Sequence, residues 1–356
     1  MKTTKTKMNN YWIFLNSGFH KTLLVIIGGC GILVLFQLFS YSTDESNENL
    51  QFQSEFLNNY GVYSLTIPAS IDFCGEKAPL SDLDIKEKLD KELLSNTYFH
   101  SNTLLYFKRA NRWFPIIEPI LKQNNIPIDF KYLALVESNL SNVISPAGAT
   151  GYWQLMKPTA ISMGLIINDE VDERYHVEKS THAACKYLSK AYNKFNNWTL
   201  SAAAYNMGIN GIQKQLTKQQ TNSYYDLLLN AETARYVFRI LAVKEILENP
   251  KSYGFKFRQD DLYPTVSYHE LKVDSSILNL VSFAKNQGIS YKTLKIFNPW
   301  LRKNKLINKE GNLYHIAIPD SGYFIHTFTD SSQNADSSKI EPKFQPITQE
   351  ADTVKN

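Results

Sequence analysis

From about residue 80 to residue 251, hydrophobic side chains recur at the spacing of amphipathic helices, one segment after another with short breaks. No pair of alternating segments in this stretch predicts a hairpin. The sequence therefore predicts an all-helical domain over residues 80–253. The expected helices cover residues 82–94, 102–123, 129–140, 180–195, 199–205 and 232–247.

The pattern changes after a linker at residues 254–262. Two alternating segments then flank two short helical ones, which predicts a small β-α-α-β module within residues 262–320. The tail at 327–356 has no periodicity and is expected to be disordered. The expected fold class is thus mainly α, a helical domain followed by this module. The module's elements are expected at residues 266–273, 277–287, 291–297 and 314–319.

An apolar run near the N-terminus, residues 23–39, follows lysines and precedes acidic residues. About 20 apolar residues span a bilayer, and positive charge favours the cytoplasmic side. We therefore expect a cytoplasmic segment at 1–21, a transmembrane signal-anchor at 22–40 and, at 41–79, an exported polar spacer and the entry segment of the helical domain. Two alternatives stay open: a signal peptide cleaved after residue 42, and a lipoprotein signal at Cys30. All three export the rest of the chain.

The charge distribution excludes one class of function. Residues 1–43 hold four lysines and no acid, so they account for the whole formal charge of +4. Residues 44–356 therefore carry no net charge, whereas nucleic-acid binding normally requires a basic face. The three cysteines include Cys30 in the apolar run, which leaves at most one disulfide, and none is predicted.

One carboxylate stands out among the predicted helices. Phe130, Leu133, Ala134 and Glu137 share one helical face, so Glu137 lies on an apolar stripe. Burial disfavours a charged carboxylate and raises its pKa, as a general acid at neutral pH requires. The alternative is a structural glutamate held by hydrogen bonds.

Two further segments combine small residues with polar and aromatic ones. Residues 145–160 form a glycine-containing loop in which Tyr152 and Trp153 are able to face sugar rings and Gln154 to hydrogen-bond them. In the alternative interpretation the tryptophan fills the core. Residues 197–211 predict a small-residue helix that holds Tyr205 in place, or else plain helix packing.

The helix expected at 232–247 extends its apolar stripe through Glu232 and Tyr236. Glu232 is suited to the positive end of the helix dipole. Two interpretations of Glu232 stay open: it is an ordinary acidic residue at the start of a helix, or it orients Tyr205.

Together these segments resemble the lytic transglycosylase family with a goose-lysozyme-like catalytic (SLT) domain, and most of all its membrane-bound D-type members. The resemblance covers roughly residues 80–320. Matching elements are Glu137 with Ser138, the loop at 145–156, Ala-Tyr-Asn-x-Gly at 204–208 and Glu-Thr-x-x-Tyr-Val at 232–237.

The resemblance implies a peptidoglycan lyase similar to glycoside hydrolase family 23. It would act exo or endo on the β-1,4 bond between N-acetylmuramic acid and N-acetylglucosamine, and leave 1,6-anhydro ends. Glu137 would be general acid and then base, and Glu232 would hydrogen-bond and orient Tyr205. The substrate-binding residues would be Ser138, Ser145, Tyr152, Gln154, Met156, Tyr205, Asn206 and Tyr236.

The sequence departs from the family at Tyr152, Lys157 and His176, where leucine, proline and aspartate are common. A metal site at His176 and His182 is not expected, because a spacing of six places them on different helix faces. No cofactor is expected either.

The C-terminal unit resembles a degenerate LysM-type glycan-binding module, for which sugar binding and a purely structural role are both open. The expected partners are peptidoglycan strands and, through residues 22–40, a membrane. The expected location is the bacterial cell envelope, with the catalytic domain outside the cytoplasm. Two other functions remain: a hydrolytic muramidase of the same fold and a non-catalytic peptidoglycan-binding scaffold.

Overall fold

The computed structural model describes residues 50, 51, 54 and 61–320. The chain divides into two compact units, residues 1–64 and 65–356, and every element discussed below belongs to the second. The predicted cytoplasmic segment, the signal-anchor at 22–40 and the tail at 327–356 lie outside the described residues. Within the part of the chain that is described, no helix has the length and apolar character needed to cross a membrane.

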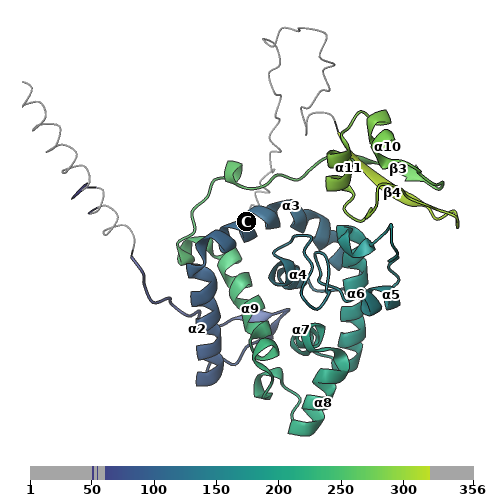
Figure 1. The fold of residues 1–356 in the computed structure, drawn as a ribbon. Coiled ribbons are helices and arrows are strands. Elements are labelled where there is room, and N and C mark those ends of the chain that lie inside the picture. Colours follow the sequence, from purple (N-terminus) through teal and green to yellow (C-terminus); the bar gives the residue numbers. More distant parts are fainter. Residues whose placement is uncertain (1–49, 52–53, 55–60, 321–356) are drawn as a thin grey trace, which may run out of the picture. The chain divides into compact units, whose positions relative to one another are not determined.

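The first part of the second unit is helical, as predicted (Figure 1). A two-stranded hairpin precedes the helices, at positions that the sequence assigned to a polar spacer. Its strands are β1 (Asp72–Phe73) and β2 (Glu76–Lys77). The helices are α2 (Leu83–Tyr98), α3 (His100–Gln123), α4 (Phe130–Ser138), α5 (Lys157–Ser162), α6 (Val177–Phe195), α7 (Trp198–Met207), α8 (Ile209–Gln219) and α9 (Ala231–Glu248).

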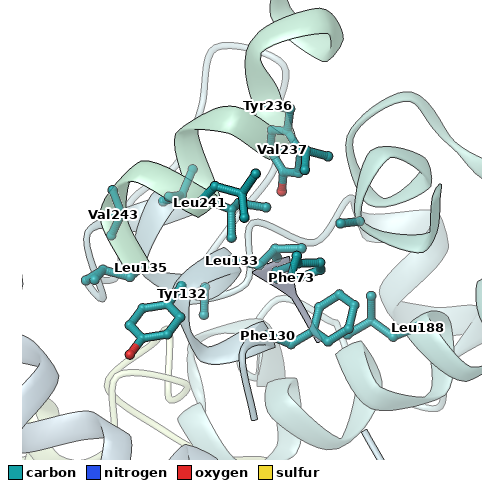
Figure 2. Close-up of a cluster of buried hydrophobic side chains, with 14 of the residues drawn as sticks. Phe73, Phe130, Tyr132, Leu133, Leu135, Leu188, Tyr236, Val237, Leu241 and Val243 are labelled. Carbon is teal, nitrogen blue, oxygen red and sulfur yellow. The ribbon is translucent and has the colours of Figure 1, made fainter. Parts of the chain in front are cut away.

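Helix α4 lies among α3, α6, α7 and α9 (Figure 1) and forms the centre of the core. Seven of its nine residues are buried, because its sequence is apolar on nearly every face. Phe130 meets the fully buried Phe73 of β1 edge to face, with ring centroids 5.0 Å apart. Figure 2 shows this cluster together with side chains of α9. The core thus fixes the position of α4, which carries Glu137 near its end.

The C-terminal module has the predicted order β3 (Tyr268–Val273), α10 (Leu280–Asn286), α11 (Tyr291–Phe297) and β4 (Tyr314–Pro319). The strands pair antiparallel from Tyr268 opposite Pro319 to Val273 opposite Tyr314. The mainly helical fold class with a small β-α-α-β module is therefore confirmed.

The core of this module includes two side chains of the helical domain, Val171 and Tyr175. Backbone bonds reinforce the contact, since the Asp172 amide donates to the Trp300 carbonyl at 2.9 Å. The guanidinium of Arg302 lies 3.9 Å from the centre of the Tyr175 ring. The module is thus packed onto the segment between α5 and α6. Whether it also binds sugar stays a prediction.

Glu76 of the hairpin supports the start of α7. Its carboxylate accepts hydrogen bonds from the amides of Trp198 (2.6 Å) and Thr199 (2.8 Å). The Thr199 hydroxyl also donates to it, at 2.7 Å. These bonds satisfy amides that have no partner within the helix, next to the positive end of the helix dipole.

We expect Glu76→Ala to lower the free energy of unfolding by roughly 1–3 kcal/mol, because two partly buried amides lose a charged acceptor. Urea denaturation measures the change. Glu87→Ala, at an exposed position of α2, is the control and should change stability by less than about 0.5 kcal/mol. Equal stability of the two variants would show that Glu76 does not support α7.

Candidate active site

Glu137 occupies the last turn of α4, which ends because Asn139 adopts a left-handed conformation with φ of 53°. The Glu137 side chain is partly buried between the buried Val136 and Ser138. Tyr236 of α9 donates its hydroxyl hydrogen to Oε1 of Glu137. Two helices that are far apart in sequence therefore fix one carboxyl group.

The environment of Glu137 raises its pKa to about 7 from an ordinary 4.5. Burial is the largest cause, because it disfavours the charged form. The Tyr236 hydrogen bond and the charge of Arg239 oppose this effect, while the charge of Glu232 adds to it. A carboxyl with this pKa holds its proton in about half of the molecules at neutral pH, so it is able both to donate and to accept one.

The Glu137 side chain lines an open cleft of about 540 Å³. Helix α2 contributes Glu92 and Asn96 to its walls, and α9 contributes Arg235 and Arg239. One η nitrogen of Arg239 donates to the Val136 carbonyl at 3.1 Å. Sequence analysis missed Glu92, Arg235 and Arg239. The available signal was the four-residue spacing of the two arginines on the helix that carries Tyr236.

The loop between α4 and α5 is held tightly. Gln154 has a φ of 45°, and its side-chain amide donates to the carbonyls of Val143 (3.0 Å) and Gly151 (2.9 Å). A Cβ atom on Gly151 would lie 2.0 Å from the Arg174 carbonyl oxygen, so only glycine fits. Ser145 also faces its own loop, since its hydroxyl accepts from the Ala149 amide at 3.0 Å.

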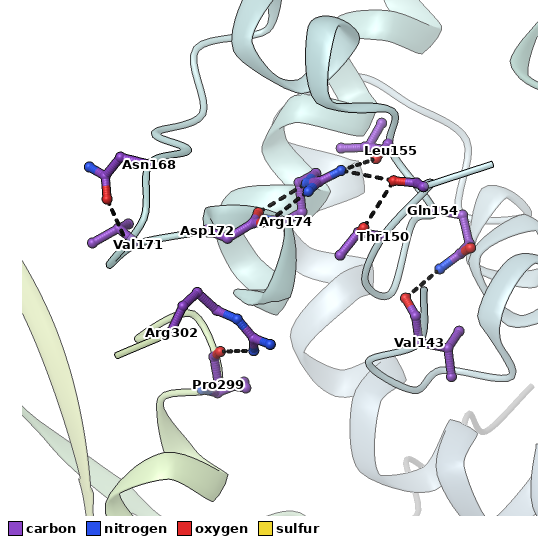
Figure 3. Close-up of polar contacts among 11 residues, drawn as sticks. Val143, Thr150, Gln154, Leu155, Asn168, Val171, Asp172, Arg174, Pro299 and Arg302 are labelled. Carbon is purple, nitrogen blue, oxygen red and sulfur yellow. Dashed lines mark hydrogen bonds and ion pairs between the residues drawn. The ribbon is translucent and has the colours of Figure 1, made fainter. Parts of the chain in front are cut away.

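Arg174, which follows this loop in the sequence, holds the loop in place. It forms a buried ion pair with Asp172 at 2.7 Å and donates to the carbonyls of Gly148 and Leu155, at 3.1 Å each. Figure 3 shows Arg174 between Asp172 and Leu155, and Gln154 reaching Val143. The predicted residues Gln154 and Ser145 are thus ordered by contacts within the protein.

The two loop aromatics do not face the Glu137 cleft. Trp153 is fully buried and its Nε1 donates to the Thr181 hydroxyl at 2.8 Å, so it fills the core, and the interpretation that it faces sugar is wrong. Tyr152 is 5 % exposed and packs edge to face on Trp113. It lines a separate cavity beside Trp113 and Tyr175. The tight turns at Gly151 and Gln154 set these directions.

Tyr205 of α7 donates its hydroxyl hydrogen to the Trp153 carbonyl at 2.7 Å. Burial, followed by the charge of Glu137, raises the pKa of Tyr205 well above its ordinary value. The expected hydrogen bond between Tyr205 and Glu232 is absent, because the Tyr205 hydroxyl donates to the Trp153 carbonyl instead. Glu232 accepts from the Asn206 side-chain amide at 3.0 Å.

The remaining predicted residues divide between the interior and the surface. Asn206 also accepts from the Thr233 hydroxyl at 2.7 Å. Ser138 lines the cleft, and its hydroxyl donates to the Tyr152 carbonyl at 2.7 Å. Met156 is exposed. Across residues 61–320, no group of three or more His, Cys, Asp or Glu side chains is arranged to hold a metal ion.

Comparisons with known proteins agree with this description. Residues 114–228 match the transglycosylase SLT domain, and residues 269–322 match the soluble lytic transglycosylase C-terminal LysM-like domain. The resemblance to lytic transglycosylases that the sequence indicated is therefore confirmed for these two stretches of the chain.

Two curated relatives are the membrane-bound lytic murein transglycosylases D of Escherichia coli strains K12 and CFT073. Each is 31 % identical over 228 residues, which are 62 % of this chain and 49 % of the relative. The chain thus spans about half the length of these relatives. Among solved structures, an inactive mutant of the lytic transglycosylase Slt from Pseudomonas aeruginosa is 22 % identical, with a TM-score of 0.34 over 42 % of this chain and 26 % of that one.

The raised pKa of Glu137 makes a prediction about stability. Between pH 4.5 and about pH 7 the folded state keeps a proton that the unfolded state has lost, so the free energy of unfolding falls as pH rises through this window. Glu137→Gln removes this loss. We expect the variant to gain stability over the wild type with rising pH, by up to about 3 kcal/mol above pH 7.

Urea denaturation between pH 4 and pH 8 measures this difference. The control is Glu118→Gln, because Glu118 pairs with Lys131 outside the Glu137 cleft. A stability difference between Glu137→Gln and the wild type that does not change with pH would contradict the raised pKa.

Proposed function

We propose that this chain is a peptidoglycan lytic transglycosylase. It cleaves the β-1,4 bond between N-acetylmuramic acid and N-acetylglucosamine without consuming water, and it leaves 1,6-anhydro-N-acetylmuramic acid ends. The observation that carries the proposal is the Glu137 carboxyl group, which is held by the Tyr236 hydroxyl and faces an open cleft inside a domain that matches the SLT family.

In the first step, protonated Glu137 donates its proton to the glycosidic oxygen while the bond from that oxygen to C1 of muramic acid breaks. Positive charge then develops at C1. In the second step, the Glu137 carboxylate takes the proton of the C6 hydroxyl as the C6 oxygen attacks C1. The anhydro ring closes and Glu137 regains its proton, so atoms and charges balance without water.

The acids of the cleft support this scheme. Besides Glu137, the cleft is lined by one other carboxylate, Glu92, which is 1 % exposed and accepts two hydrogen bonds from Arg235. A retaining glycosidase needs a second carboxylate as nucleophile, and Glu92 is already occupied. The N-acetyl group of the substrate supplies the missing stabilisation at C1, as in other substrate-assisted glycosidases.

Tyr236 and Tyr205 have positioning roles in this scheme. The Tyr236 hydroxyl holds one oxygen of Glu137, which leaves the other oxygen for the substrate. Tyr205 is fixed by the Trp153 carbonyl next to this carboxyl. Ser138, Ser145, Gln154, Met156 and Asn206 are proposed to line the sugar subsites. Tyr152 would contribute by supporting the loop from its inner side, since the Tyr152 side chain is buried.

We further propose that the enzyme works in the cell envelope. The two curated relatives are membrane-bound murein transglycosylases, and the apolar run at residues 23–39 supports an anchor at 22–40. Peptidoglycan lies outside the cytoplasm, so the catalytic domain must be exported to reach it.

Digestion of purified peptidoglycan tests this function. We expect the wild-type protein to release muropeptides that are lighter by one water and lack a reducing end, as read by mass spectrometry. Glu137→Gln should lower the rate by roughly 100-fold or more, because the proton donor is lost. Glu118→Gln is the matched control and should retain activity, since Glu118 lies outside the cleft.

Two outcomes would contradict the proposal. Products with reducing ends would identify a hydrolytic muramidase of the same fold. Binding of the wild-type protein to peptidoglycan without any product would identify a scaffold.

A further inference from the structure

Helix α9 directs two arginines into the cleft that holds Glu137. Arg235 and Arg239 are four residues apart, so they lie on one face of the helix, one turn from each other. Both line the Glu137 cleft. Like charges at this spacing repel each other. Negative charge beside the two arginines therefore stabilises this face of the helix.

The protein itself supplies part of that charge. Glu92 of α2 accepts from Nε of Arg235 at 2.8 Å and from its Nη2 at 3.0 Å. The Glu92 side chain is 2 % exposed, whereas that of Arg235 is 51 % exposed. Glu92 thus holds the Arg235 guanidinium on its buried side, and the other side of the guanidinium is open to the solvent. An arginine has five N–H donors, and Glu92 takes two, which leaves three for a ligand.

The two arginines of the cleft differ in their partners. The Glu92 carboxylate pairs with Arg235, whereas Arg239 donates to the Val136 carbonyl, which is neutral. Both guanidinium groups line the cleft. Their positive charge attracts ligands of the opposite sign.

The sugars of a peptide-bearing strand are neutral, because the lactyl carboxyl of muramic acid forms the amide bond to the peptide, so the sugars offer no partner for this charge. The peptide attached to the lactyl group of muramic acid carries carboxylates. A guanidinium binds a carboxylate through two parallel hydrogen bonds, which gives both strength and orientation.

We propose that Arg235, with Arg239 beside it, forms an anion subsite that binds a carboxylate of the peptide attached to muramic acid. Glu92 is the positioning residue that fixes the Arg235 guanidinium. This inference rests on the proposed function, because it takes peptidoglycan as the substrate. The subsite makes the enzyme prefer strands whose peptides carry free carboxylates over strands whose peptide carboxylates are blocked as amides.

A purely structural role would look different. The Glu92–Arg235 pair joins α2 to α9, so its loss would weaken the whole domain and affect every substrate alike. The carboxylate subsite predicts a loss that depends on the peptide. Comparing two substrates separates the two roles.

The test measures binding in the Glu137→Gln background of the full chain, so that substrate is not consumed. Soluble glycan strands of one length are prepared with their peptides, and in a second sample the peptide carboxylates are converted to neutral amides. We expect Arg235→Ala to weaken binding of strands with free peptide carboxylates about tenfold, or about 1.4 kcal/mol. Binding of the amidated strands should change less than about twofold.

Arg258→Ala is the matched control, because Arg258 is also ion-paired, to Asp261, but lies outside the cleft. It should leave binding of both strands unchanged. A further variant, Arg235→Lys, keeps the charge but not the two-bond geometry, and should recover only part of the affinity. Circular dichroism melting curves verify that each variant is folded.

Three results would overturn the subsite. These are equal losses on both strands, no loss on either, or binding by the chain with Arg235 intact that is no tighter for strands with free peptide carboxylates. A failure of the proposed function is seen separately, as the absence of anhydro products from the wild-type enzyme. The binding difference does not depend on turnover, so it decides the subsite in either case.

Discussion

The withdrawal of the Glu137 carboxyl from water is the interaction on which the rest of the site depends. Burial raises the pKa of this group to about 7, against the opposing effects of the Tyr236 hydroxyl and the Arg239 charge. Without burial the carboxyl would be ionised at neutral pH and would have no proton to give. With burial but without Tyr236, its oxygens would lose the hydrogen bond that fixes their direction.

The scaffold maintains this balance with long-range contacts. Helix α4 is buried in the core, so the backbone of Glu137 has little freedom. Helix α9 provides Tyr236 and both cleft arginines, and it is held against α2 by the Glu92–Arg235 ion pair. The loop after α4 is closed by Gln154 and fastened by Arg174. Each contact limits how far the walls of the cleft can move from the carboxyl.

Helices α2, α3, α4, α6, α7 and α9, the C-terminal module and the position of Glu137 on an apolar stripe were predictable, because periodicity is a local property of the sequence. Helices α5 and α8 were not predicted. The partners of the charged residues were not. Glu92 and Arg235 are 143 positions apart, and Glu76 lies 122 positions before Trp198. Such pairs depend on how helices pack, which periodicity does not report. The directions of Tyr152 and Trp153 depend on positive φ angles at Gly151 and Gln154. The contact of Glu232 with Asn206 rather than Tyr205 depends on how α7 packs against α9.

The protonation of Glu137 in the folded protein is the most direct test of this account. Glutamate labelled with ¹³C at the side-chain carboxyl would be titrated by NMR, and the Glu137 signal identified by its absence in Glu137→Gln. We predict a titration midpoint near pH 7. A midpoint near 4.5, the ordinary value for a glutamate, would contradict the claim that burial prepares Glu137 to act as an acid.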